Sequence, residues 1–297
     1  MNFPKLKNKL ILAPIAGYSD IAFRVLCREY GAALAYTEMV SANSLLHKKT
    51  LVQLNEKDRP VTLQIFGNNT EMISKAATLF KDKVDIIDLN LGCPDYKIRR
   101  SGAGSALLDK PNKIDEILNK LQKLEVPITI KLRLHKNLNK IVKICESNDV
   151  SAICLHARTI KHGYSGDANL NAIKSLKEST DIKIIGNGNI FCPEDAQNML
   201  DFTKCDYVMI GRAAISNPYI FRQTLDYLED GKYKEMDKLK LFFEYYELYK
   251  EYKIDNFTRL LWHALSISKS MRNSKRKRLE LSRCKNEKEL FSMIQNQ

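Results

Sequence analysis

The chain has 297 residues, 44% of them hydrophobic, which suits one large globular domain or a domain with a smaller appendage. No apolar run approaches the roughly 18 residues of a membrane span, and no apolar stretch of a secretory signal follows the basic opening segment. The seven cysteines are odd in number and form no C-x-x-C pair, which argues against a disulfide framework or a zinc ribbon and for a reducing cytoplasm. A net charge of +13 favours a polyanionic partner, above all a nucleic acid, over a merely soluble basic protein.

Short runs of β-branched residues recur through the first three quarters of the chain. We predict eight strands, at 10–12, 34–37, 61–66, 86–90, 128–133, 152–156, 183–186 and 207–211. Most are nearly continuous apolar runs, as expected of strands buried on both faces. Helical patterns lie between them, for example at 69–80, 110–124 and 192–200. This alternation predicts a (β/α)8 TIM barrel; a doubly wound open sheet is the weaker alternative, because no glycine fingerprint follows the first strand.

The composition changes after about residue 231. Residues 232–297 have aromatic, helical patterns and contain 16 Lys and Arg against 9 Asp and Glu, so they carry +7 of the net +13. The run 272–278 has five cations in seven residues. We therefore predict a catalytic barrel over 1–231 and a small, all-helical, basic domain over 232–297 that binds RNA. A solvated charge run at a helix end is the plainer alternative.

Functional groups of such a barrel lie at the carboxyl ends of its strands and in the loops that follow. The seventh and eighth strands end in glycine turns ahead of helices, which predicts a phosphate site. Gly186, Gly188 and Gly211 would allow the backbone to approach an anion closely, and Arg212 would add a charge-assisted contact.

Polar side chains also interrupt the apolar strands. Lys131 and Gln64 are unusual in buried strands, and together they suit a heterocycle with donor and acceptor edges. An outward-pointing lysine is the alternative for Lys131. His156 and Arg158 end the sixth strand beside the predicted phosphate site.

Cys93 follows the fourth strand in a glycine–proline turn, where we expect neighbouring cations to lower its thiol pKa. Four other cysteines are interpreted as small buried hydrophobes: Cys27, Cys145, Cys154 and Cys205. Residues 91–110 show no clear regular structure, and loops of about 20 residues are usually functional or disordered. The loop's basic side chains, which we expect to face phosphates, are Lys97, Arg99 and Arg100.

Six segments occur in one order: LAPIAGYSD, LNLGCPDYKIRRSGAGSALL, TIKLRL, LHARTIKHGYSGDA, IIGNGNI and MIGRAAISNP. Over roughly residues 9–222 the chain thereby resembles the tRNA-dihydrouridine synthases, and most of all their bacterial B-type branch. The N-L-G-C-P-x-x-K block together with the H-x-R-T-x-x-x-x-Y-x-G block is highly specific. The resemblance implies an FMN enzyme that uses NADPH or NADH to reduce selected uridines in tRNA to 5,6-dihydrouridine.

The resemblance also implies roles for single residues. Cys93 would protonate C5 of the uracil after hydride from FMN reaches C6, Asn90 would help to place the base, and Arg158 would contact the substrate. The base would have to be extruded from the RNA to be reached. Residues that would hold the flavin are Pro14, Ile15, Ala16, Gln64, Lys131, His156, Asn187, Gly188, Asn189, Gly211 and Arg212. Residues that would hold RNA phosphates are Lys97, Arg99, Arg100, Lys275, Arg276, Lys277 and Arg278.

Two other functions compete with this interpretation. A small-molecule FMN oxidoreductase of the dihydroorotate or dihydropyrimidine type would share the barrel and the flavin site, but it would not need a basic helical appendage. A non-enzymatic RNA-binding protein on a degenerate barrel would not need Cys93, Lys131 and the Gly211–Arg212 turn together. Nothing in the sequence indicates a stable protein partner, so we expect a monomer.

Overall fold

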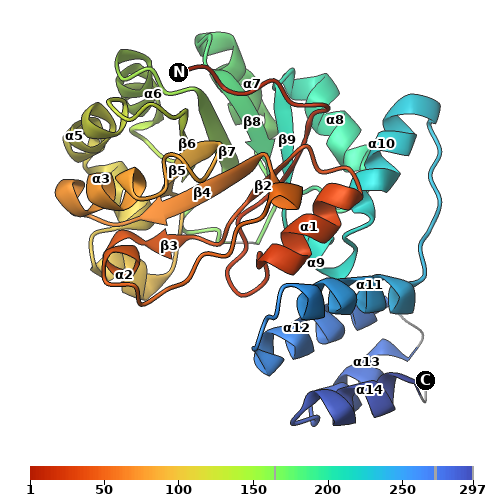
Figure 1. Ribbon diagram of the computed structural model, residues 1–297. Helices are drawn as coiled ribbons and strands as arrows, with labels where there is room; N and C mark the ends of the chain where they lie inside the picture. Colours follow the sequence, from red (N-terminus) through yellow and green to blue (C-terminus); the bar gives the residue numbers. More distant parts are fainter. Residues whose placement is uncertain (164, 271–272, 296–297) are drawn as a thin grey trace.

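The computed structural model describes residues 1–163, 165–270 and 273–295. Eight parallel strands form its centre (Figure 1): β1 (Leu10–Leu12), β2 (Leu34–Tyr36), β4 (Val61–Phe66), β5 (Ile86–Leu91), β6 (Ile128–Leu134), β7 (Ala152–Thr159), β8 (Lys183–Asn187) and β9 (Tyr207–Ile210). β1 pairs with both β2 and β9, and β2 pairs with β4, so the sheet closes on itself. The predicted (β/α)8 barrel is confirmed, and the open sheet is excluded.

Helices surround the barrel, and their ends follow local sequence signals. α5 begins with Pro111 at its first position and buries Ile114, Ile117, Leu118 and Leu121, the i, i+3, i+4 spacing of one helix face. The helices of the barrel region are α1 (Ile21–Glu29), α2 (Ala42–Leu46), α3 (Thr70–Thr78), α4 (Tyr96–Arg100), α5 (Pro111–Leu121), α6 (Leu138–Ser147), α7 (Leu170–Ser179), α8 (Pro193–Thr203), α9 (Arg212–Ser216) and α10 (Ile220–Asp230). Short 3-10 helices lie at η1 (Glu56–Asp58) and η2 (Gly104–Asp109).

The strand expected at 34–37 is interrupted. β2 ends at Tyr36, and the chain returns to the sheet as β3 (Val40–Ser41), which also pairs with β4. Tyr36 pairs with Thr62, and Val40 pairs with Ile65. The segment from β2 to β3 therefore has one residue more than the stretch of β4 beside it, as in a β-bulge. The break brings Met39 to the rim of the barrel, where it lines a cavity.

The expectation for residues 91–110 is wrong. Two short elements, α4 and η2, occupy most of this segment. Asp95 caps α4, because its carboxylate accepts a hydrogen bond from the backbone N–H of Ile98 (3.1 Å). The segment is therefore ordered as two short helices, of which η2 packs against β5 and α4 packs against η2.

Inside and outside faces of the strands alternate as parallel geometry requires. Ile11 packs in the barrel interior with Cys154 and Met209, while Leu10 and Leu12 pack outward against the helices. Cys27, Cys145, Cys154 and Cys205 are all buried, as expected of small hydrophobes. Within the described ranges no helix combines the length and the apolar character needed to cross a membrane.

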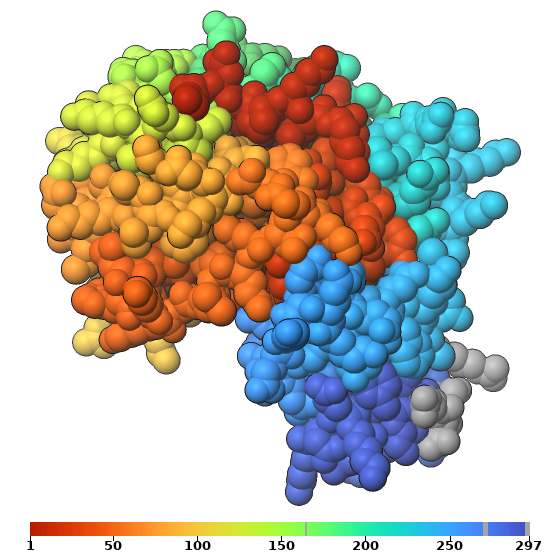
Figure 2. All heavy atoms as spheres, viewed as in Figure 1, coloured from red at the N-terminus to blue at the C-terminus, as the bar shows by residue number. Residues whose placement is uncertain are grey.

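After α10 the chain runs into helices that lie against one side of the barrel as a separate lobe (Figures 1 and 2): α11 (Lys238–Glu251), α12 (Phe257–Ile267), η3 (Ser268–Ser270), α13 (Ser274–Leu281) and α14 (Glu287–Gln295). Polar side chains join these helices to the barrel. The Tyr245 hydroxyl donates to Asp20 of the barrel (2.9 Å), and Arg259 forms an ion pair with Glu38 (2.5 Å). The lobe is thus bonded to the loops at the mouth of the barrel as well as packed on them.

A buried ion pair fastens the loop before β4 to α1. Arg24 Nη2 lies 2.6 Å from Asp58 Oδ2, and the two side chains are 3% and 0% exposed. The remaining guanidinium donors reach the backbone carbonyls of Ser19 and Gln53, both at 2.7 Å. All of the charge is therefore compensated inside the protein.

We expect Asp58→Ala to lower the free energy of unfolding by about 3 to 5 kcal/mol, because it leaves the Arg24 charge buried without a partner. Urea unfolding followed by circular dichroism measures this change. Glu251→Ala, which breaks an exposed ion pair with Lys57, is the control and should have a far smaller effect. Equal effects of the two substitutions would contradict the role given to the buried pair.

Candidate active site

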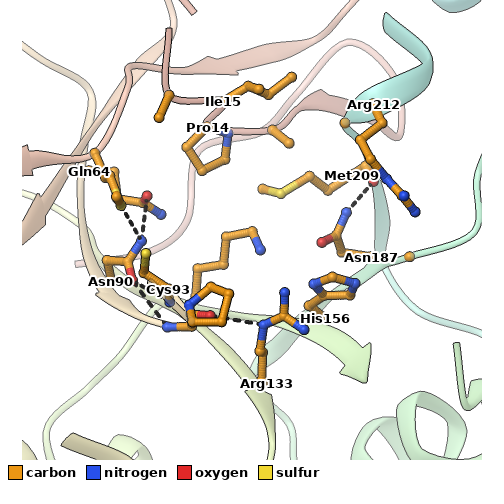
Figure 3. Close-up of a pocket in the computed structure, with 18 of the residues that line it drawn as sticks. Pro14, Ile15, Gln64, Asn90, Cys93, Arg133, His156, Asn187, Met209 and Arg212 are labelled. Atoms are coloured by element: carbon orange, nitrogen blue, oxygen red, sulfur yellow. Dashed lines mark hydrogen bonds between the residues drawn. The ribbon is translucent and has the colours of Figure 1, made fainter. Parts of the chain in front are cut away.

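A cavity of about 750 Å³ opens at the carboxyl ends of the strands (Figure 3). Gln64, Asn90 and Cys93 lie on one side of it, and His156, Asn187 and Arg212 lie on the other. The sequence-predicted residues that line the cavity are Pro14, Ile15, Ala16, Gln64, Asn90, Cys93, Lys97, Lys131, His156, Asn187, Gly188, Asn189, Gly211 and Arg212. The fold therefore brings together residues from the ends of β1 and of β4 to β9.

A chain of hydrogen bonds runs under one wall of the cavity. The fully buried Asp88 carboxylate accepts from Thr129 Oγ1 (2.6 Å) and from Gln64 Nε2 (2.8 Å). Gln64 Oε1 in turn accepts from Asn90 Nδ2 (2.8 Å). Asn90 Oδ1 then accepts the backbone N–H groups of Gly92 (3.1 Å) and Cys93 (3.0 Å). The buried acid is thus linked to the cysteine turn through two amides.

The donor-to-acceptor direction of these hydrogen bonds is set at Asp88, because an ionised carboxylate can only accept hydrogen bonds. Its two partners must donate, so the Gln64 amide turns its nitrogen towards Asp88 and its oxygen towards Asn90. Burial raises the pKa of Asp88 to about 6, with hydrogen bonds and the charge of Lys131 opposing the rise. The acid is therefore mostly ionised at neutral pH, and both amides are held in one orientation.

Cys93 is held through its backbone, which leaves its thiol at the cavity wall. Its backbone N–H donates to Asn90 Oδ1 (3.0 Å), and its carbonyl accepts from the N–H of Ser105 (3.2 Å). Arg133, 2% exposed, donates from Nε to the carbonyl of Gly92 (2.9 Å) and from Nη1 to that of Gly163 (2.6 Å). The turn that carries the thiol is therefore bonded on both sides, which restricts where the sulfur can lie.

The expected lowering of the Cys93 pKa is wrong. Burial raises the pKa of this thiol, and the positive charges of Arg133 and Lys131 offset only part of the shift. Arg99 and Arg100, which the sequence placed near the sulfur, are exposed on α4 and do not line the cavity. The thiol therefore keeps its proton at neutral pH and can act as an acid.

Positive charge dominates the opposite wall. Burial, together with the charges of Lys131, Arg133, Arg158 and Arg212, lowers the pKa of His156 to about 2. His156 is consequently neutral at physiological pH. Among the described residues that line the cavity, Asp95 is the only one with a carboxylate, so the cavity is suited to an anionic ligand.

At the ends of β8 and β9 the backbone itself forms part of the cavity wall, at Gly188 and Gly211; with Arg212 these residues are called the glycine cradle below. Gly188 has a φ of +125°, and a Cβ there would lie 2.9 Å from the Cβ of Ala168, so only glycine fits without a shift. Asn187 donates to the carbonyl of Met209 (2.7 Å), which joins the ends of β8 and β9. Arg212 follows Gly211 directly and lies over the ring of Phe191 (5.3 Å). Backbone and guanidinium groups there can hold a phosphate.

Gly186 does not belong to this cradle. A Cβ on it would meet the sulfur atoms of Met199 (2.9 Å) and Cys205 (3.1 Å). Its lack of a side chain therefore serves the packing of β8 against α8 and not the approach to an anion, which corrects the prediction from sequence.

Arg158 is also placed differently from the prediction. It is 3% exposed and does not line the cavity. Its Nε donates to the carbonyls of Ser165 and Gly166 (both 3.1 Å), Nη1 lies 3.2 Å from His156 Nε2, and Nη2 donates to the Asn189 side chain. With every nitrogen engaged, Arg158 positions the cavity wall and does not reach a substrate in this structure.

The basic run of the C-terminal region lies outside the cavity. Lys275, Arg276, Lys277 and Arg278 are on α13, whereas Arg272 lies outside the described residues. The sequence interpretation missed several lining residues, among them Met39, Arg133, Phe191 and Met209. Arg133 had a usable signal, because it lies two residues after Lys131 on the same face of β6.

A closed barrel with a protonated thiol, a lysine and a glycine cradle at its mouth defines an enzyme site of the (β/α)8 class. A family model described as "Dihydrouridine synthase (Dus)" matches residues 11–297. The tRNA-dihydrouridine synthase B of Vibrio parahaemolyticus is 40% identical over 246 residues, which cover 79% of this chain and 76% of the relative. That of Shewanella oneidensis is 36% identical over 274 residues, covering 86% and 85%, and that of Escherichia coli K12 is 37% identical over 239 residues, covering 77% and 74%. The chain belongs to the dihydrouridine synthase family.

Solved structures of similar fold agree with this architecture. The old yellow enzyme homologue from Zymomonas mobilis has a TM-score of 0.55 at 11% identity and covers 80% of this chain and 92% of its own. The complex of 2-naphthoyl-CoA reductase with 2-naphthoyl-CoA has a TM-score of 0.60 at 11% identity and covers 76% and 50%. At these identities the likeness establishes the barrel fold.

The raised pKa of Cys93 can be measured by alkylation, because the thiolate is the reacting form. We expect the rate with iodoacetamide to reach half its maximum above pH 8.5, the ordinary thiol pKa being about 8.5. A Cys192→Ala background removes the other half-buried thiol, and mass spectrometry of the Cys93 peptide gives the rate. A midpoint at or below the ordinary value would show that the cations prevail over burial.

Proposed function

We propose that this chain is an FMN-dependent tRNA-dihydrouridine synthase that takes its electrons from NADPH or NADH. The observation that carries this proposal is the protonated Cys93 thiol, which lies across the cavity from Arg212 (Figure 3), while Gly188 and Gly211 line the same cavity. The chain is an oxidoreductase that reduces uridine in tRNA to dihydrouridine, in agreement with its family and with B-type relatives at 36–40% identity.

The residues present fit a flavin mononucleotide. Gly188 and Gly211 offer backbone to a phosphate at the ends of β8 and β9, and Arg212 adds its charge. Pro14 and Ile15 form an apolar wall (Figure 3), and Lys131, which also lines the cavity, would supply a cation to the ring. Burial is the main reason that His156 stays neutral, and the positive charges that add to this effect form an environment suited to an anionic cofactor.

In this proposal FMN, when bound, supplies the hydride that adds to C6 of the uracil. Cys93 supplies the other half of the reduction: its S–H bond breaks, and the proton goes to C5. The C5–C6 double bond is thereby saturated, and the thiolate regains a proton from water. Asn90 fixes the backbone of the cysteine turn and lines the cavity beside it, so it holds the acid in place.

Rival functions explain less of the chain. A small-molecule flavin oxidoreductase would have no use for α11–α14, in which exposed cations lie beside the mouth of the barrel. A non-enzymatic RNA-binding protein would not maintain the Asp88-to-Cys93 chain of hydrogen bonds. We place the enzyme in the cytoplasm, because seven free thiols suit a reducing compartment. In this proposal it is a monomer, and residues 232–297 are its RNA-binding domain.

Cys93→Ala tests the proton donor. The variant should purify yellow, bind tRNA and accept electrons from NADPH, because its flavin contacts are intact. Reoxidation of its flavin by tRNA should slow by about a hundredfold or more, since a positioned acid contributes roughly 10²–10⁴-fold. Stopped-flow absorbance of the flavin gives both rates. Cys192→Ala is the control and should behave as wild type; near-normal dihydrouridine formation by Cys93→Ala would remove the assigned role.

Lys131→Ala tests the flavin site. Loss of this cation should leave less FMN bound after purification or slow the reduction of the flavin by NADPH, because the negative charge gained near the ring loses its partner. The ratio of flavin to protein absorbance and the anaerobic reduction rate measure the two effects. Lys143→Ala removes an exposed lysine from α6 and should change neither. Full flavin occupancy with an unchanged rate would contradict the assignment.

A further inference from the structure

A second cavity, of about 480 Å³, lies where the loop after β1 meets the C-terminal helices. Its lining is basic and hydroxylated over an apolar floor: Tyr18, Leu265, Ser266, Lys269, Lys275, Arg278, Leu279 and Ser282. Among the described residues, no carboxylate lines it. Three cations and three hydroxyl groups around one hollow are the donor set of a phosphate site.

The second cavity and the active site share one short loop. Pro14, Ile15 and Ala16 line the active-site cavity, and Tyr18 lines the second one. The Tyr18 hydroxyl and Ser266 Oγ lie 3.1 Å apart, which ties the loop to α12. Because consecutive Cα atoms are about 3.8 Å apart, Ala16 and Tyr18 are separated by no more than about 7.6 Å. The two cavities are therefore lined by neighbouring residues of one loop.

The chain's single tryptophan lies between the two cavities. Gly17, the residue between Ala16 and Tyr18, has a φ of +83°, and a Cβ on it would lie only 2.6 Å from the Trp262 ring. The indole is thus packed on the loop backbone at one edge, yet it is 44% exposed. The Tyr18 ring, which lines the second cavity, lies 6.1 Å from the indole ring. An exposed aromatic ring is a platform on which a nucleobase can stack.

The basic run on α13 is not uniform. Lys275 and Arg278 are three residues apart, so they share one helix face, and both line the second cavity with Lys269 of η3. Arg276 forms an ion pair with Glu280 (2.8 Å), its side chain is 83% exposed, and it does not line the cavity; nor does Lys277. Two of the four cations are therefore directed into the pocket and two are not.

We propose that this second cavity is an RNA subsite that holds a backbone phosphate next to the uridine entering the active site, with Trp262 stacking on a neighbouring base. The inference rests on the proposed function, because it takes tRNA as the polyanion. Lys269, Lys275 and Arg278 neutralise the phosphate, and the Tyr18 and Ser266 hydroxyls orient it. The site acts beside the reaction centre and contributes no group to the chemistry.

Two variants with the same change of charge on the same helix test the subsite. Lys275→Gln with Arg278→Gln removes the two pocket-facing cations, whereas Lys277→Gln with Arg276→Gln removes the two others. Two lost phosphate contacts should weaken tRNA binding roughly tenfold to twentyfold at about 0.15 M salt and lower the log–log salt slope by about 1.5. The second pair should change affinity by less than about threefold, since exposed cations away from the phosphate are largely screened.

Trp262 fluorescence gives an independent reading. We expect tRNA to quench the emission of the wild-type protein, and the variant that lacks Lys275 and Arg278 to show the quench only at correspondingly higher tRNA concentrations. Trp262→Leu, which keeps apolar packing on Gly17, should weaken tRNA binding, while Trp262→Phe should retain most of it. FMN content should be normal in all of these variants.

The outcomes separate the subsite from the function on which it rests. If both charge pairs weaken tRNA binding equally, the helix presents a diffuse positive face, and the subsite does not exist. The same conclusion follows if neither pair weakens it. If tRNA does not reoxidise the flavin of the wild-type enzyme, the proposed function itself is wrong, whatever the variants bind.

Discussion

Closure of the parallel sheet is the constraint from which the active site follows. All eight strands pair in parallel, and β1 pairs with both β2 and β9, so the strands point the same way and end around one mouth. Residues as distant in sequence as Pro14, Cys93 and Arg212 then line one cavity. The interior packing of Ile11, Cys154 and their neighbours fills the barrel below this level, so ligands are confined to the rim.

Burial at this rim sets the chemistry of the ionisable groups. It raises the pKa of Cys93 and lowers that of His156, so one group keeps a proton and the other stays uncharged. Asp88 remains able to ionise beneath them because Thr129 and Gln64 donate to it. Its carboxylate fixes the orientation of two amides, and the second of these holds the cysteine turn. The protonated thiol of Cys93 and the groups that hold its turn thus belong to one buried network.

The C-terminal helices extend this site outward. Arg259 binds Glu38, and Tyr245 binds Asp20, so α11 and α12 are fixed to loops that carry cavity residues. Trp262 lies against the loop that contains Gly17, and the cavity beyond it is basic. The mouth of the barrel therefore continues into a surface with aromatic and cationic groups. Such a surface suits an extended polyanion better than a small substrate.

By itself the sequence determined the strands, the barrel and the main cavity residues. Strands buried on both faces leave continuous apolar runs, against which Gln64, Lys131 and Cys93 stand out as polar exceptions. Only the tertiary structure decided the direction of the Cys93 pKa, the packing role of Gly186 and the enclosure of Arg158. It also created the second cavity, from residues as distant in sequence as Tyr18 and Ser282. Each of these properties depends on which distant residues become neighbours and on how much water they exclude, and local sequence patterns do not contain that information.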